Sequence, residues 1–223
     1  MASELDMPME EIDKSSLTKR IYAAVREGLS TGQFQPGERM NVRQLSESLG
    51  TSQTPVREAL LQLLAERVLI TGEARSIQVP QLNKRSYMEL REIRVALETL
   101  ITRKATLGAD ENTISRLEQI HAELIEAKTN GDFKAAMRLN RSFHFELYRV
   151  ADMPSLLAII DNLWVQVGPF LNFLYPGPDT NQKQHEHLVI INAVKSKSPD
   201  DAANAVERDI VLGGRQILDH LDA

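Results

Sequence analysis

Gln53 and Arg57 stand four residues apart in the stretch Ser52-Gln-Thr-Pro-Val-Arg57, so on a helix they share one face. A glutamine amide matches the N6 and N7 edge of adenine, and an arginine guanidinium matches guanine O6 and N7 or a phosphate. Thr54 lies in the same first turn, and Arg43 stands ten residues upstream of Gln53. These residue types at this spacing favour a surface that contacts double-stranded DNA.

The elements that position these side chains are two short helical patterns around Gly50, one from Asn41 to Leu49 and one opening at Ser52. In each, apolar residues recur three, four and seven positions apart, as on the buried face of an amphipathic helix. Ser52 is placed to cap the second helix, and its first turn presents Gln53 and Thr54. The expected apolar faces consist of Val42, Leu45 and Leu49 in the first helix and Val56, Leu60, Leu63 and Leu64 in the second. Two helices joined by a short Gly-containing turn predict a helix-turn-helix.

The flanking segments extend this motif. A helix is expected from Ser15 or Ser16 to Thr31-Gly32, followed by a turn at Pro36-Gly37. Two β-prone triplets, 68–70 and 77–79, enclose a polar turn and predict a hairpin with Arg75 at its tip, where it would reach the DNA backbone or minor groove. Residues 15–80 are therefore expected to form a winged helix-turn-helix. The alternative is an ordinary helix pair in which Arg43 and Gln53 are solvated surface residues, and the complete set of elements argues against it.

The charge distribution agrees with a DNA contact at one end of the chain. The 223 residues carry a net charge of −5, but residues 15–85 hold 10 Lys and Arg against 6 Asp and Glu. Residues 1–14 hold 1 basic and 5 acidic residues and are expected to be a disordered acidic arm. A basic segment in an acidic chain suits a protein that docks on nucleic acid through one module.

Residues 81–85 are expected to be a linker, and residues 86–223 show no strand pattern. Helix-stopping residues divide this part into six expected helices at 86–107, 110–129, 132–152, 154–174, 181–196 and 198–221. Short connections make neighbouring helices antiparallel. The predicted fold class is mainly α, with an N-terminal winged helix-turn-helix and a C-terminal all-helical bundle.

Composition excludes several classes of function. Cysteine is absent, so there is no disulfide framework, thiolate metal site or Cys nucleophile. No signal-peptide pattern and no run of 18 apolar residues occurs, which leads us to expect a cytoplasmic protein without membrane contact. The sequence contains no Gly-rich phosphate loop and no Ser/His/Asp arrangement, so it gives no indication of catalysis.

Three motifs in the N-terminal part resemble the DNA-binding domain of GntR-family bacterial transcription regulators: Gln35-Pro-Gly-Glu-Arg-Met40, Leu45-Ser-Glu-Ser-Leu-Gly50 and Ser52-Gln-Thr-Pro-Val-Arg-Glu-Ala-Leu60. The resemblance implies that Arg43, Ser52, Gln53, Thr54 and Arg57 contact DNA. Two positions depart from the family pattern. Glu66-Arg67 replaces the common Glu-Gly after the second helix, and Ser76 replaces a wing-tip glycine.

Residues 86–223 resemble the FCD effector domain of the FadR-type branch, through Arg94-Val-Ala-Leu-Glu98, Phe143-His144 and His187-Leu-Val-Ile-Ile-Asn-Ala-Val194. The segment Leu163-Trp-Val-Gln-Val-Gly-Pro169 is similar to a VanR-like subgroup. Many such domains hold a divalent metal, and the matching positions here are Asn140, His144, His187 and Asp209. Two imidazoles and a carboxylate suit zinc, nickel or manganese. The alternative is that His144 and His187 are hydrogen-bonded core residues. His121, His185 and His220 are expected at the surface.

The resemblance implies a ligand-responsive regulator, expected to be a repressor, that binds a palindromic operator as a homodimer. The expected effector is a small carboxylate that binds the metal and Arg94. One alternative is a regulator whose helical domain only dimerises, or binds a larger acyl ligand. A remote alternative is a metal-dependent enzyme.

Overall fold

The computed structural model describes residues 14–174 and 186–221 and divides them into two compact units. One unit contains the chain up to Arg26 together with Arg39–Gln78, and the other contains Glu27–Glu38 together with the chain from Val79 onward. The segment Glu27–Glu38, which the sequence places in the winged domain, thus groups with the helical unit. Of the predicted acidic arm at residues 1–14, only Lys14 is among the described residues.

The first unit has the predicted winged helix-turn-helix. Helix α1 (Lys14–Ser30) extends across both units, and α2 (Val42–Ser48) and α3 (Gln53–Ala65) form the helix-turn-helix. The wing consists of β1 (Ile70–Thr71) and β2 (Ile77–Gln78), which pair antiparallel around the 3-10 turn η1 (Glu73–Arg75). The hairpin is confirmed, with strands shorter than the two predicted triplets.

The helix-turn-helix has a small apolar core. Val56, Ala59, Leu60 and Leu63 of α3 are fully buried. Tyr22 and Arg26 of α1 both donate hydrogen bonds to Glu66 Oε2, at 2.7 and 3.0 Å, which ties α1 to the end of α3. The prediction that Leu49 belongs to the buried face of α2 is wrong. Leu49 is 43% exposed because α2 ends at Ser48, and Ser46 is the buried residue of that helix.

The two departures from the family pattern have different backbone consequences. Arg67 has φ +59°, the left-handed conformation that glycine adopts without a steric penalty. A side chain there costs about 1–2 kcal/mol. Ser76 has φ −68° and needs no glycine, because the left-handed residues of the wing are Ala74 and Arg75. The wing therefore closes without glycine at position 76.

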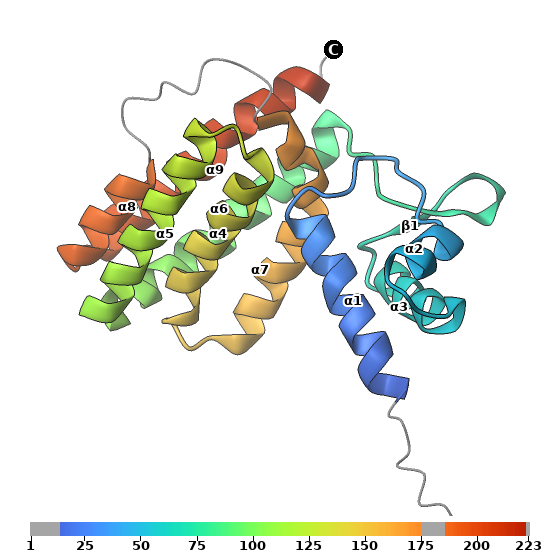
Figure 1. Cartoon of the computed structure of the whole chain (residues 1–223). Helices are drawn as coiled ribbons and strands as arrows, with labels where there is room; N and C mark the ends of the chain where they lie inside the picture. The colour runs from blue at the N-terminus through green and yellow to red at the C-terminus, as the bar shows by residue number, and fades with distance from the viewer. Residues whose placement is uncertain (1–13, 175–185, 222–223) are drawn as a thin grey trace, which may run out of the picture. The chain divides into compact units, whose positions relative to one another are not determined.

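The second unit is all-helical in its described part (Figure 1). It contains α4 (Lys84–Gly108), α5 (Glu111–Thr129), α6 (Phe133–Arg149), α7 (Pro154–Val167), η2 (Gly168–Leu174), α8 (Glu186–Lys195) and α9 (Pro199–Leu221). Three starts are capped by side chains, since Asn83, Asp110 and Asp132 accept hydrogen bonds from the first turns of α4, α5 and α6. The helix predicted at 154–174 changes to 3-10 geometry at Gly168-Pro169, and the start of the helix predicted at 181–196 lies outside the described residues.

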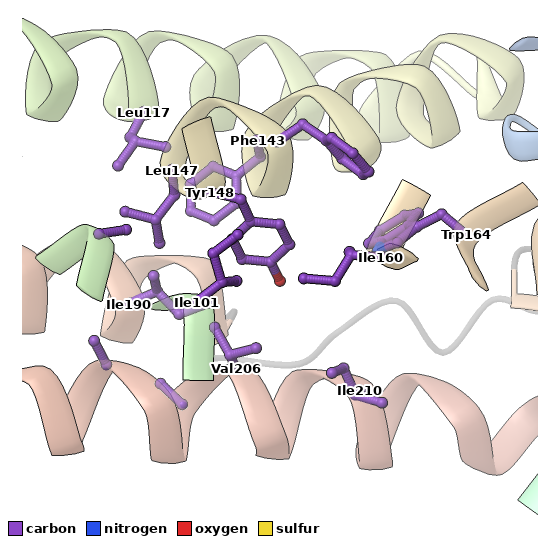
Figure 2. Close-up of a cluster of buried hydrophobic side chains, with 14 of the residues drawn as sticks. Ile101, Leu117, Phe143, Leu147, Tyr148, Ile160, Trp164, Ile190, Val206 and Ile210 are labelled. Carbon is purple, nitrogen blue, oxygen red and sulfur yellow. The ribbon is translucent and has the colours of Figure 1, made fainter. Parts of the chain in front are cut away.

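Helix α4 is at the centre of this unit and packs against α6, α7, α8 and α9. Figure 2 shows the core that results, with Ile101 from α4, Phe143 and Tyr148 from α6, and Trp164 from α7. Burying each side chain of this size contributes about 1.5–3 kcal/mol. The core therefore fixes α4, α6 and α7 relative to one another, and these helices carry most of the buried polar groups described below.

Candidate nucleic-acid interface and candidate metal centre

The start of α3 presents the side chains expected to read DNA. Ser52, Gln53, Thr54 and Arg57 are exposed, and the buried face of α3 lies on its opposite side. Ser52 occupies the N-cap position with an extended backbone, but its side chain makes no capping hydrogen bond. The α3 start thus offers hydroxyl, amide and guanidinium groups to a partner, as a recognition helix does in the major groove.

Arg43 and Arg75 flank this surface in sequence and are also exposed. Arg43 Nε lies 2.9 Å from Glu47 Oε1, but the two side chains are 77% and 62% exposed. An exposed pair of this spacing contributes only about 0.3–0.5 kcal/mol, so a phosphate can take the place of Glu47. Arg75 lies in the wing turn with φ +59°. The DNA candidates named from the sequence are thus all solvent-accessible within one unit.

The candidate metal ligands come together in the second unit from three helices. His144 of α6 and His187 of α8 are almost completely buried, and the Asp209 side chain of α9 is 22% exposed. His144 Nε2 lies 3.2 Å from Asp209 Oδ2 and 3.3 Å from His187 Nε2. One donor atom from each residue lies within 4.8 Å of the others. Asn140 is half-buried one helical turn before His144.

His121 was expected at the surface, and that prediction is wrong. It is 7% exposed on α5, and its ring meets the His187 ring edge-on with the centroids 5.8 Å apart. Burial first, and then the charge of Lys128, lower the pKa of His121. His220 is exposed as predicted and stacks on Phe173 at 3.7 Å. His185 lies outside the described residues. Sequence spacing offered a signal for His121, because it stands four residues after Leu117 and three before Leu124, which are both buried on α5.

Arg94 is buried and already paired. Its Nε donates to Glu98 Oε1 at 2.6 Å, and its guanidinium lies 4.6 Å above the Trp164 ring. Burial acts to lower the pKa of Arg94, but the Glu98 carboxylate outweighs burial and raises that pKa above its usual value. Two of its five N–H donors face Glu98. An effector contact by Arg94 would therefore use the other donors.

Three residues beside the histidines were not predicted as site residues. Glu98 is completely buried and accepts hydrogen bonds from Tyr148 Oη at 2.7 Å and from Trp164 Nε1 at 3.1 Å. Tyr148 Oη also lies 3.2 Å from His144 Nδ1. Burial first, and then Glu98, raise the pKa of Tyr148 well above its usual value. The four-residue spacings of Glu98 from Arg94 and of Tyr148 from His144 were the available signals.

Two units of this kind, a winged helix-turn-helix with an exposed polar start of α3 and a helical bundle with a buried polar cluster, define a DNA-binding transcription regulator. Residues 17–79 match the family "Bacterial regulatory proteins, gntR family", and residues 89–211 match the FCD domain. The chain belongs to the GntR family, in its branch with an FCD domain. The family consists of transcription regulators and not of enzymes. No helix in the described ranges is long and apolar enough to cross a membrane.

Individual relatives agree with this assignment. The chain is 33% identical to the "HTH-type transcriptional regulator McbR" of Escherichia coli K12, over 83% of this chain and 85% of that protein. It is 30% identical to the E. coli K12 "HTH-type transcriptional repressor RspR", over 86% of this chain and 83% of that protein. The solved structure of E. coli McbR/YncC superposes with a TM-score of 0.85 at 28% identity, covering 92% of this chain and 98% of the other.

The DNA surface yields a first prediction. Arg43→Ala and Arg57→Ala should each weaken binding to an operator fragment by about 1–3 kcal/mol if they contact base edges. If the arginine contacts only phosphate, its removal should instead reduce the number of counterions released on binding by about one. This number is read from the slope of log affinity against log salt concentration. Fluorescence anisotropy at several salt concentrations, on DNA enriched from random sequence by the wild-type protein, measures both effects.

Lys134→Ala is the matched control, because Lys134 is an exposed cation of α6 in the other unit. It removes one positive charge without touching α2, α3 or the wing. Circular dichroism should show the same helix content in all three variants. Wild-type affinity in both arginine variants would rule out these residues as DNA contacts.

Proposed function

We propose that this regulator is controlled by a small carboxylate effector through a divalent metal held in the FCD domain, and that it binds a palindromic operator as a homodimer. The observation that carries the proposal is the meeting of two buried imidazoles and one carboxylate in the helical unit. We further propose that it acts as a repressor, as the name of the relative RspR states for that protein.

The donor set supports a metal on chemical grounds. Two atoms that each lie about 2.1 Å from one ion, at angles between octahedral and tetrahedral values, are about 3.0–3.4 Å apart. The separations of His144 Nε2 from Asp209 Oδ2 and from His187 Nε2, at 3.2 and 3.3 Å, fall in this range, and the third separation, of His187 Nε2 from Asp209 Oδ1, is wider at 4.0 Å. Two imidazoles with a carboxylate suit zinc, nickel or manganese, and the Asn140 amide oxygen is a candidate fourth ligand.

A bound metal would also meet an electrostatic requirement of the cluster. A carboxylate oxygen and an imidazole nitrogen lone pair repel each other at 3.2 Å unless a proton or a cation lies between them. His144, His187 and Asp209 would hold a metal in place of such protons, and their shared ion would link α6, α8 and α9. Its remaining coordination positions would accept a carboxylate oxygen of the effector.

Positive charge near the cluster supports an anionic effector. Burial lowers the pKa of Lys128 on α5, and the charge of Asp209 opposes that shift, so the amine lies within electrostatic range of the candidate ligands. Arg94 provides a second cation in the same unit, joined to the histidines through Glu98 and Tyr148. The effector carboxylate would thus enter a region with a metal and two basic side chains.

A stripe of exposed apolar residues on α4 supports dimerisation. Ile93, Leu100 and Leu107 are spaced by seven residues and are 40%, 42% and 62% exposed. Apolar residues at this spacing form one line along a helix, which suits packing against the same line on a second helix. A second copy of the chain is the proposed partner of this stripe, and two DNA-binding units related by a two-fold axis match a palindrome.

Control by the effector then follows from linkage. A ligand that binds one arrangement of the dimer more tightly shifts the population of that arrangement. A coupling free energy of about 1–3 kcal/mol changes operator affinity by about 5–150-fold. The α4 helix carries both the exposed stripe and the residue Glu98, so it is the proposed route between the metal cluster and the dimer.

The metal is tested by titrating zinc or nickel into protein that has been treated with a chelator. We expect one site per chain by calorimetry, and we expect His144→Ala to remove measurable binding. Affinity should fall as the pH is lowered, because imidazole binds metal only in its neutral form. His220→Ala, a histidine outside the cluster, should bind like the wild type. Equal binding by His144→Ala and wild type, or no heat with either metal, would contradict the proposal.

Effector control is tested by thermal shift with a panel of small organic acids, with and without the bound metal. We expect at least one acid to raise the melting temperature only in the metal-loaded protein and to lower operator affinity by about 5–150-fold. Arg94→Lys keeps a cation beside Glu98 but removes the planar guanidinium group and its paired N–H donors. It should therefore weaken the response to the effector while metal binding is retained. A panel that changes neither quantity would favour a helical domain that only dimerises.

The dimer is tested by sedimentation velocity. A wild-type mass of twice the 25.1 kDa chain is expected, and Leu100→Glu should sediment as a monomer and lose most of its operator affinity. Leu188→Glu places the same charge at a leucine of α8 that is 45% exposed, and it should remain dimeric. A Leu100→Glu protein that stays dimeric would place the interface elsewhere.

A further inference from the structure

The last turn of α1 belongs to the second unit and is buried there. Leu29, Ser30 and Thr31 are 1%, 0% and 1% exposed. The Ser30 and Thr31 hydroxyls donate to the Glu27 carbonyl oxygen at 3.0 and 2.7 Å, so both buried polar groups are satisfied. Gly32, with φ +68°, then reverses the chain. The end of α1 is therefore a fixed part of the helical unit.

Gly168, where α7 meets η2, makes this burial possible. A Cβ at position 168 would overlap the Leu29 carbonyl oxygen and would lie 2.6 Å from Ser30 Cα. The backbone of Gly168 has φ −48° and ψ −46°, which are helical values open to any residue. Glycine is thus required here by the close approach of two backbones and not by its own conformation.

An ion-pair cluster adds a second contact to the same turn of α1. Arg141 of α6 pairs with Asp161 of α7, and its Nη1 lies 3.7 Å from Glu27 Oε2. The Glu27 side chain is 52% exposed, so this pair contributes little. The backbone contact at Gly168 is therefore the main attachment of α1 to α7.

The same part of α7 borders the buried polar cluster. The Trp164 indole N–H donates to Glu98 Oε2 at 3.1 Å, and the ring centroid lies 5.3 Å from that of His144. The Gly168 N–H donates to the Trp164 carbonyl oxygen, so the two residues lie on consecutive turns. A movement of Trp164 therefore displaces Gly168, and no side chain lies between Gly168 and α1 to absorb the displacement.

The preceding part of α1 is bonded to α3 in the first unit. Thr18 donates to Glu58 Oε2 at 2.9 Å, and Arg26 donates to Glu66 Oε2 at 3.0 Å. Glu58 lies within α3, and Glu66 is its C-cap residue. Figure 1 shows α1 as one unbroken helix from Lys14 to Ser30. A single helix thus contacts α7 in one unit and α3 in the other.

We propose that α1 couples the two units: its last turn, packed on Gly168, follows the position of α7 and transmits it to α3. This inference rests on the proposed effector control, because it names the element through which that control reaches the DNA-binding surface. Linkage makes the coupling reciprocal. Operator binding by the first unit must therefore alter α7, and this effect can be measured without knowing the effector.

The test uses the full-length protein and an operator fragment as the probe. Amide hydrogen exchange of residues 154–171 is followed by mass spectrometry with and without saturating DNA. In the wild type we expect exchange to slow by about 5–150-fold, because DNA fixes α3 and, through α1, the end of α7. Gly168→Ala displaces the α1 turn, so its exchange should be the same with and without DNA. No slowing in the wild type, or equal slowing in Gly168→Ala, would overturn the proposal.

Gly213→Ala is the matched control, because a Cβ at this glycine of α9 meets no atom within 4 Å. It should show the slowing of the wild type. A second variant replaces both Ala23 and Ala24, which are exposed in α1, by glycine. Glycine loosens the helix between its two attachments, so the DNA-dependent slowing should decrease. If Gly168→Ala fails to fold by circular dichroism, this double variant decides, and full wild-type slowing in it would overturn the proposal.

Nickel calorimetry on the same proteins separates this proposal from the metal proposal. Gly168→Ala should bind nickel like the wild type, because it changes none of the candidate ligands. A wild type that shows the slowing and binds no nickel would support coupling through α1 and contradict the metal site. A wild type that binds nickel and shows no slowing would support the metal site and overturn coupling through α1.

Discussion

The helical unit depends on the compensation of one buried charge. Moving a carboxylate such as Glu98 out of water costs several kcal/mol unless charge and hydrogen bonds replace its hydration. Arg94 supplies the opposite charge one turn away on α4, and Tyr148 and Trp164 supply donors from α6 and α7. Because each donor has to reach the same two oxygens, these hydrogen bonds restrict how the three helices can pack. Apolar packing around Ile101 and Phe143 provides the energy, and Glu98 adds the directional requirement.

The hydrogen bonds to Glu98 also connect the core to the candidate metal cluster. The Tyr148 hydroxyl that satisfies Glu98 also meets His144, so the group that orders the core is one contact away from the cluster of His144, His187 and Asp209. Any ligand that changes the charge at this cluster acts on side chains that hold α4, α6 and α7 together. The DNA-binding unit is organised differently. Its small apolar core under α3 leaves the polar start of that helix in solvent, and on α2 the exposed ion pair of Arg43 with Glu47 is weak.

Much of the fold was predictable because it is local. Apolar spacing, Pro-Gly and Asn-Gly breaks and the capping residues lie within a few positions of the elements they define, and the predicted helices from 86 to 221 match α4–α9 within a few residues where the structure describes them. The wrong predictions concern the positions at which helices end or change geometry. Leu49 follows the apolar spacing of α2 but lies beyond its last turn, and the helix expected through 174 changes geometry at Gly168-Pro169. Spacing alone does not show where a neighbouring element stops covering a helix.

By itself, the sequence determined the winged helix-turn-helix, the helical second part and the family, and it named the candidate residues for DNA and metal binding, because each depends on residue type and short spacing. Only the tertiary structure decided which of these residues meet. It buried His121 and left His220 exposed, and it gave Arg94 a partner in Glu98. It also joined Glu98 to Tyr148 and Trp164, which are 50 and 66 residues away in the chain. Contacts at such separations arise from the packing of whole helices, and no local pattern specifies which side chains that packing brings within hydrogen-bonding distance.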